Sequence, residues 1–180
     1  MRNLKKVLAL VMVLALACTC FAGAAFTDQK DIDNTTAVNT VAALGIIKGY
    51  EDGSFGPNKV VTRAEMAKMI YVLKNKGNDD GASYFKGLSV PLNDISGHWA
   101  EGYIKYCYSL GIIAGKGDGT FAPDAPVTGL EAAKMLLVVA GYNAEKEGLV
   151  GTTWGVKVAA LGSTVGLFNG YTTSFDVGAP

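Results

Sequence analysis

The sequence has few of the residues from which most catalytic and metal sites are built. It contains one histidine, His98, and three cysteines, two of which, Cys18 and Cys20, lie in the apolar N-terminal stretch. A catalytic triad or a zinc site needs several such groups in a defined arrangement. We therefore predict no catalytic residue, no metal site and no cofactor. His98 is expected to form a hydrogen bond at a helix start, and Cys107 to be a small buried apolar residue.

An excess of charge of one sign is also missing. The chain has 16 basic and 16 acidic residues, and loss of the basic residues Arg2, Lys5 and Lys6 with an N-terminal leader leaves three more acids than bases. A mildly acidic chain has no general attraction for nucleic acid or for an anionic membrane surface. Any anion must therefore be held by a local site.

Residues 1–24 have the three parts of a secretory signal peptide: a basic start, an apolar run over 7–21 and small residues at Ala22 and Ala24. The apolar run is short for a membrane span and has no basic stop after it. We expect cleavage after Ala24 or Ala25, hence a secreted chain without a membrane span. The alternative is lipidation at Cys18, because Ala-Leu-Ala-Cys loosely resembles a lipobox.

Beyond the leader, the chain repeats itself at a constant offset of 66 residues. The matched pairs are Asp28 and Asp94, Leu44 and Leu110, Gly45-Ile46-Ile47 and Gly111-Ile112-Ile113, Asp52-Gly53-Ser54-Phe55 and Asp118-Gly119-Thr120-Phe121, Pro57 and Pro123, Thr62 and Thr128, and Glu65 and Glu131. One offset over so many positions is strong evidence for a tandem repeat.

A third copy begins at a shorter offset. Trp154 follows Trp99 by 55 residues, as Gly166 follows Gly111, and the sequence ends at Pro180 before a second helix could begin. We assign module one to residues 25–75, a surface loop or linker to 76–91, module two to 92–142 and a truncated third module to 143–180.

Each complete copy follows a helix–loop–helix plan, so we predict an all-α fold. In copy two, apolar residues recur at helical spacing from Trp99 to Leu110, with Ser96 or Gly97 at the start of the helix and Gly111 at its end. The second helix of each copy begins with the Thr-x-x-Glu pattern of a capping box.

This combination of motifs resembles the S-layer homology domain over almost the whole mature chain. In copy one the matching segments are Phe26-Thr27-Asp28, Gly45 to Tyr50, Asp52 to Phe55, Pro57 and Thr62-Arg63-Ala64-Glu65; in copy two they are Asp94, His98-Trp99-Ala100, Gly111 to Ile113, Asp118 to Pro123, and Thr128 with Glu131. The resemblance implies a mainly helical, pseudo-threefold spindle of three modules, here with an incomplete third prong.

The resemblance also implies a function and a site. The family anchors exported proteins to the bacterial envelope by non-covalent binding of secondary cell-wall polysaccharide, often pyruvate-modified, in grooves between modules. The glycan-binding residues carried over by position are Arg63, Asp28, Gly45, Gly49, Tyr50, Asp94, Trp99, Gly111 and Lys116.

The chemistry of Arg63 supports this assignment independently. It follows a helix N-cap, where free backbone N–H groups favour an anion, and a guanidinium can hold a carboxylate through two hydrogen bonds. The alternatives are a solvated charge or an ion pair for Arg63, and a core position for Trp99. In copy two Gly129 replaces the arginine, and Lys116 stands where copy one has Tyr50.

The sequence therefore predicts a non-enzymatic anchor at the cell wall or S-layer whose partner is wall polysaccharide. A second hypothesis is an assembly role, in which the modules contact other S-layer or envelope proteins. A third is that the chain is the targeting part of a longer exported enzyme.

Overall fold

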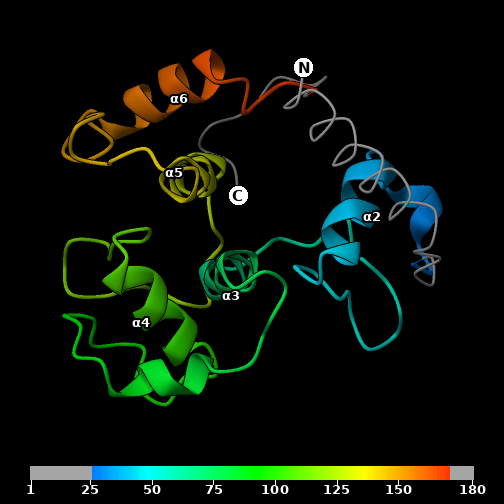
Figure 1. The fold of residues 1–180 in the computed structure, drawn as a ribbon, viewed down its shortest axis with the longest axis horizontal. Helices are drawn as coiled ribbons and strands as arrows, with labels where there is room; N and C mark the ends of the chain where they lie inside the picture. Colours follow the sequence, from blue (N-terminus) through cyan, green and yellow to red (C-terminus); the bar gives the residue numbers. More distant parts are fainter. Residues whose placement is uncertain (1–25, 171–180) are drawn as a thin grey trace, which may run out of the picture. The chain divides into compact units, whose positions relative to one another are not determined.

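The computed structural model describes residues 26–170. The predicted signal peptide, the lipidation candidate Cys18 and the last ten residues lie outside this range. Within it the chain forms helices and no strands, which confirms the all-α prediction; the spindle arrangement stays a prediction. The chain divides between Asn58 and Lys59 into two compact units, which we describe separately (Figure 1).

Unit 1, described over residues 26–58, contains η1 (Gln29–Asp31) and α2 (Thr35–Ala43). The side chain of Asn34 caps the start of α2 by accepting a hydrogen bond from the Ala37 N–H at 3.2 Å. At its end, Gly45 adopts φ +72° and its N–H donates to the Ala42 carbonyl oxygen at 2.9 Å. This left-handed closure requires a residue without a Cβ penalty, which explains the glycine.

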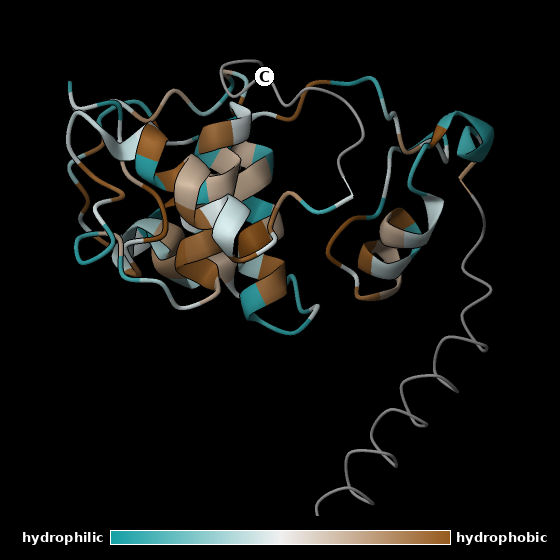
Figure 2. Ribbon diagram, turned by 90° about the horizontal axis from the view of Figure 1, so that it is seen from above, coloured by the Kyte–Doolittle hydropathy of each residue, from teal (hydrophilic) through white to brown (hydrophobic). Residues whose placement is uncertain are grey.

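Unit 2, described over residues 59–170, contains α3 (Arg63–Lys74), η2 (Ala82–Gly87), α4 (Glu101–Ser109), α5 (Gly129–Val139) and α6 (Trp154–Thr164). Helix α3 packs on α4 and α5, α4 packs on η2, and α5 packs on α6 (Figure 1). Figure 2 shows hydrophobic residues concentrated on the helices of this unit. Its fully buried side chains include Ile70, Ile95, Ile104, Cys107 and Phe121.

Helix α4 ends as predicted but begins later than predicted. It starts at Glu101 rather than near Ser96 or Gly97, because the preceding residues are held in turns. The Ala100 N–H donates to Nδ1 of His98 at 3.1 Å, and the Gly97 N–H donates to Oε2 of Glu101 at 3.1 Å. The closing residue Gly111 has φ +67°, as expected for the left-handed cap.

Both predicted capping boxes are confirmed. The Thr62 hydroxyl accepts a hydrogen bond from the Glu65 N–H while the Glu65 carboxylate accepts one from the Thr62 N–H. Thr128 and Glu131 form the same reciprocal pair at the start of α5. The repeat therefore fixes where each second helix begins.

The segment 76–91 is more ordered than the surface loop expected from its composition. It contains η2, which lies so close to α4 that a Cβ on Gly102 would come within 2.0 Å of the Ala82 carbonyl oxygen. Its Phe85 ring packs edge-on against the rings of Tyr71 and Tyr106. Apolar and aromatic contacts thus hold the insertion against unit 2.

Cys107 occupies the small apolar core position predicted for it. Its side chain is fully buried, and this burial raises the pKa of the thiol to about 12. Across residues 26–170 no helix is long and apolar enough to cross a bilayer, and no three His, Cys, Asp or Glu side chains gather as metal ligands would.

Candidate functional site at the junction of the copies

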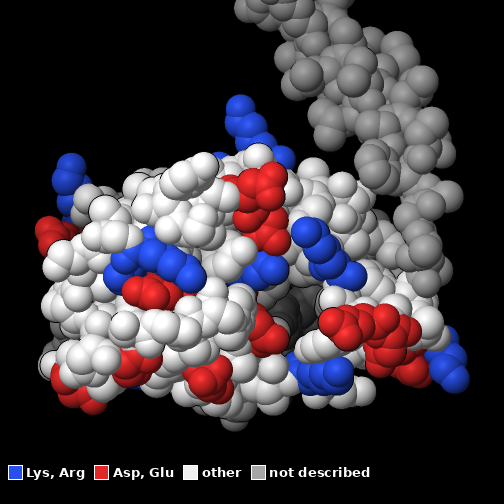
Figure 3. All heavy atoms as spheres, turned by 90° about the horizontal axis from the view of Figure 1, so that it is seen from below, with Lys and Arg blue, Asp and Glu red and all other residues white. Residues whose placement is uncertain are grey.

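The surface carries no broad region of one charge sign on the face drawn in Figure 3. Lysine and arginine side chains there are interspersed with aspartate and glutamate among uncharged atoms. This agrees with the balanced composition of the chain. Recognition of a charged ligand therefore depends on local arrangements of residues.

The predicted site residues Asp28 and Asp94 build the loops after the first helices. Asp94 accepts hydrogen bonds from the Phe121 and Ala122 N–H groups at 2.8 and 2.7 Å. Asp28 accepts the equivalent pair from Phe55 and Gly56, both at 2.8 Å, and these bonds hold the pKa of its carboxyl below the usual value. Both aspartates thus have a structural role, while their role in glycan binding stays a prediction.

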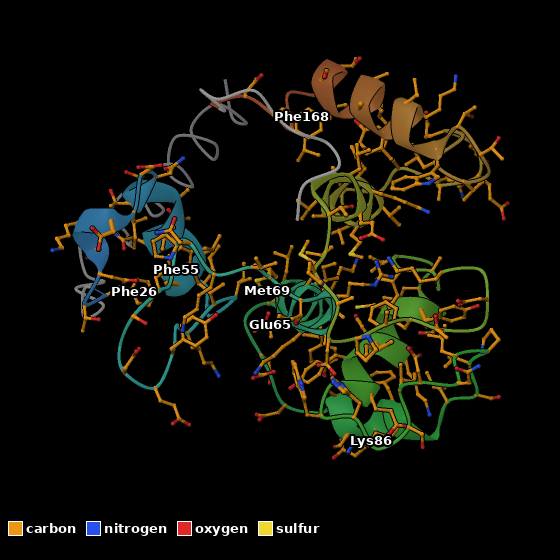
Figure 4. The ribbon with its side chains drawn as sticks, turned by 180° about the vertical axis from the view of Figure 1, so that it is seen from behind. Phe26, Phe55, Glu65, Met69, Lys86 and Phe168 are labelled. Carbon is orange, nitrogen blue, oxygen red and sulfur yellow. The ribbon has the colours of Figure 1, made fainter. Side chains whose placement is uncertain are left out.

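Gly49 lies where the loop of unit 1 passes under an aromatic pair. Its φ is +71°, and a Cβ there would come within 2.6 Å of both the Phe26 ring and the Ser54 carbonyl oxygen. The centres of the Phe26 and Phe55 rings lie 5.6 Å apart. Both residues are labelled in Figure 4. The neighbouring Tyr50 is 40% exposed.

Arg63 is buried rather than solvated, with 2% of its surface exposed. Its Nε donates to the Phe121 carbonyl oxygen at 2.7 Å, and Nη1 donates to Oε1 of Glu131 at 2.6 Å. Its Nη2 lies 3.4 Å from the Ala114 carbonyl oxygen, and the guanidinium stands 4.6 Å from the centre of the Phe121 ring. An arginine from copy one therefore holds together the loop and the second helix of copy two.

The expectation of free N–H groups at the start of α3 is wrong. The Arg63 N–H donates to the Ala125 carbonyl oxygen and the Ala64 N–H to that of Pro123, both at 2.9 Å. The Glu65 N–H is satisfied by the capping hydroxyl of Thr62. The loop of copy two thus takes the place that an anion was expected to fill.

Glu131 is the acidic centre of this junction. Its Oε1 accepts hydrogen bonds from Arg63 and from the Lys116 ammonium at 2.9 Å, and its Oε2 accepts from the Thr128 N–H at 3.0 Å. Burial alone would raise the pKa of Glu131. The hydrogen bonds from Thr128 and Lys116, together with the charge of Arg63, outweigh burial and keep this pKa below the usual value.

Beside this ion-pair network lies a pocket of about 540 Å³ formed by residues of all three copies. The lining residues are Arg63, Ile112, Ile113, Ala114, Gly115, Lys116, Gly117, Glu131, Lys134, Met135, Val150, Gly151 and Trp154. The Lys134 ammonium lies 5.6 Å from the centre of the Trp154 ring. An aromatic face beside cationic groups suits a ligand that combines a ring with an acidic group.

The pocket unites only two of the predicted site residues, Arg63 and Lys116. Three others lie in unit 2 but outside the pocket lining: Asp94, Trp99 and Gly111. The remaining four lie in unit 1: Asp28, Gly45, Gly49 and Tyr50. Sequence reasoning missed Lys134 and Trp154 as site residues. The repeat contained a signal for Trp154, which stands at the position of the predicted residue Trp99 in the preceding copy. It contained none for Lys134, whose equivalent Lys68 was not a candidate.

Trp99 does not occupy the core position that residue preference favours. It precedes α4, is 52% exposed and lies with its ring 5.5 Å from that of His98 and 6.2 Å from that of Tyr103. His98 is fixed by the helix-start bond expected of it, and its Nε2 lies 3.2 Å from Oδ1 of Asp124. Trp99 therefore presents an aromatic surface outside the pocket.

Comparison with known proteins also finds two copies of one domain in the chain. The S-layer homology domain matches residues 25–67 and 91–133. A cell surface protein of Thermoanaerobacter kivui is 35% identical over 150 residues, which cover 79% of this chain and 19% of that protein. A cellulosome-anchoring protein of Acetivibrio thermocellus is 35% identical over 113 residues, covering 62% of this chain and 25% of that protein.

Enzymes also occur among the similar proteins. An amylopullulanase of Thermoanaerobacterium thermosulfurigenes is 28% identical over 155 residues, which cover 81% of this chain and 8% of that enzyme. The chain thus spans a quarter or less of the length of each of these relatives. The names of the Thermoanaerobacter kivui and Acetivibrio thermocellus proteins support a general role at the cell surface. With two tandem matches and the motifs of both in place, residues 25–67 and 91–133 are S-layer homology domains.

Proposed function

We propose that the chain anchors an exported protein to the bacterial cell envelope by non-covalent binding of wall polysaccharide in the pocket between Arg63 and Trp154. The observation that carries this proposal is the pocket itself, about 540 Å³, where an aromatic ring and lysine side chains converge. This volume lies in the usual range for ligand pockets of roughly 300–1,000 Å³. We propose no catalytic role.

The lining residues suit a sugar with an acidic substituent. The Trp154 ring offers a flat surface for the apolar face of a pyranose, and the loop 112–117 offers backbone groups for its hydroxyls. Lysine side chains supply positive charge for an acidic substituent such as a pyruvate ketal, whose presence is inferred from the family resemblance. Because the chain as a whole is not basic, binding depends on this local site.

The experiment is a sedimentation assay of the mature chain, residues 25–180, with purified cell-wall sacculi. We expect co-sedimentation with intact sacculi and its loss after the acidic wall polymer is removed with hydrofluoric acid. Trp154→Ala should weaken binding, while Tyr84→Ala, whose residue is 88% exposed on η2, should not. Equal binding to intact and stripped sacculi would show that the acidic polymer is not the ligand. Retention by envelope proteins and not by sacculi would favour the assembly role.

A further inference from the structure

We infer that Lys134 makes the direct contact with an acidic group of the sugar bound in this pocket, while Arg63 acts indirectly by positioning Glu131 and the loop of copy two. This inference rests on the proposed function above. It assigns the contact with the acidic group to a residue other than the motif arginine.

Lys134 is the lysine of the pocket without a protein acceptor. It extends from α5 over the Trp154 ring, and no hydrogen bond or ion pair joins its ammonium to another residue between 26 and 170. Its partial burial lowers the pKa of the ammonium, although the nearby Glu131 carboxylate acts in the opposite direction. A half-buried ammonium with unmatched donors is stabilised by an incoming anion.

The equivalent lysine of copy one, Lys68, has a carboxylate partner within the protein. Lys68 stands 66 residues before Lys134, at the same position after the capping threonine. Its ammonium pairs with Oδ2 of Asp79 at 3.2 Å and lies 5.8 Å from the centre of the Tyr103 ring. Asp79 belongs to the insertion 76–91, so Lys68 has an internal acceptor from a segment for which copy two has no counterpart of that length.

The other cations of the pocket are already engaged. The Arg63 guanidinium donates to oxygen atoms of Phe121, Ala114 and Glu131, and the Lys116 ammonium donates to Glu131. Glu131 is the one acidic side chain among the lining residues, against three basic ones, Arg63, Lys116 and Lys134. The lining therefore carries an excess of two positive charges, which an oxyanion would offset at Lys134 with least disturbance of the network.

The test compares Lys134→Met, Lys134→Arg and the control Lys157→Met in the sacculus assay. Lys157 is an exposed lysine of α6 outside the pocket lining. We expect Lys134→Met to weaken binding about tenfold, because a charge-assisted hydrogen bond is lost, and Lys134→Arg to retain most of it. Lys157→Met should bind like the wild type, and the thermal melting of all three variants should stay close to that of the parent.

NMR of the Lys134 side-chain signals with small probes identifies whether the oxyanion is a carboxylate or a phosphate. The probes are a methyl 4,6-O-(1-carboxyethylidene) hexoside, its neutral methyl ester and a hexose phosphate. Shifts with the acid and not the ester assign a carboxylate, and shifts with the phosphate assign a phosphorylated glycan. Equal shifts with acid and ester would overturn the inference.

Two further outcomes separate the inference from the proposed function. If the wild-type chain binds intact sacculi and Lys134→Met binds equally well, the role of Lys134 is wrong while the anchoring function stands. If the wild-type chain fails to bind sacculi, the anchoring function fails and the inference fails with it.

Discussion

The loops after the first helices, residues 52–57 and 118–123, have the same internal bonding and different surroundings. In each, an aspartate 27 residues earlier in the chain accepts the N–H of the loop phenylalanine. Phe55 is nevertheless half-buried, whereas Phe121 is fully buried. The difference arises because Phe121 is part of the hydrophobic core of unit 2 and also lies under the Arg63 guanidinium, whereas Phe55 is in none of the buried clusters of the described residues. The repeated sequence thus determines the local conformation, and tertiary contacts determine burial.

The largest effect expected from this comparison is that of truncating the two phenylalanines. Phe121→Ala should destabilise unit 2 by about 3–5 kcal/mol, because it leaves a cavity beside the guanidinium, while Phe55→Ala should cost unit 1 roughly half as much or less. Urea unfolding followed by circular dichroism, with amide exchange to separate the units, measures both. Equal losses would contradict the role assigned to Arg63.

Removal of the guanidinium should give the next largest effect. We expect Arg63→Leu to destabilise unit 2 by about 2–4 kcal/mol, because it leaves the Phe121 carbonyl oxygen without its side-chain donor and removes the buried charge that pairs with the Glu131 carboxylate. Thermal unfolding at neutral pH is the measurement, and Lys74→Leu in the exposed last turn of the same helix is the control. A loss no larger than that of the control would show that the buried pair contributes little.

The smallest effect expected is a loss of stability in acid that is specific to the second loop and its helix. The pKa of Glu131 is lower in the folded chain than its ordinary value of 4.5, so the ionised carboxylate stabilises the fold fully above pH 4.5. This stabilisation is lost as the pH falls through the pKa of Glu131 in the folded chain. Melting temperatures from pH 7 to pH 3 should therefore fall less steeply for Glu131→Gln than for the wild type. An unchanged slope, matching the exposed control Glu145→Gln, would speak against this linkage.

The repeat predicted the local structure well because local structure depends on nearby residues. The capping boxes at Thr62 and Thr128, and the glycine closures at Gly45 and Gly111, need only a few neighbours and were correct. The predicted start of α4 was wrong because the side chain of His98 accepts a hydrogen bond in the turn before the helix begins. The spacing of apolar residues is the same in that turn and in the helix, so it did not show where the helix starts.

The candidate site was less predictable because it depends on contacts between copies. The sequence shows that Arg63 follows a helix cap, but not that the Pro123 and Ala125 carbonyl oxygens fill the helix end. Likewise Lys68 and Lys134 are equivalent by offset. Only the position of Asp79 in the folded insertion distinguishes a paired lysine from an unpaired one.

The position of α3 has a consequence for how such repeats can be cut and recombined. By sequence α3 ends copy one, yet its first turn is bonded into the loop of copy two and it folds within unit 2. A deletion ending at residue 75, the repeat boundary, would remove the arginine that copy two needs. A deletion ending at Asn58 would keep it. Gene fusions that preserve this helix with the following copy should yield soluble protein more often than fusions made at the repeat boundary.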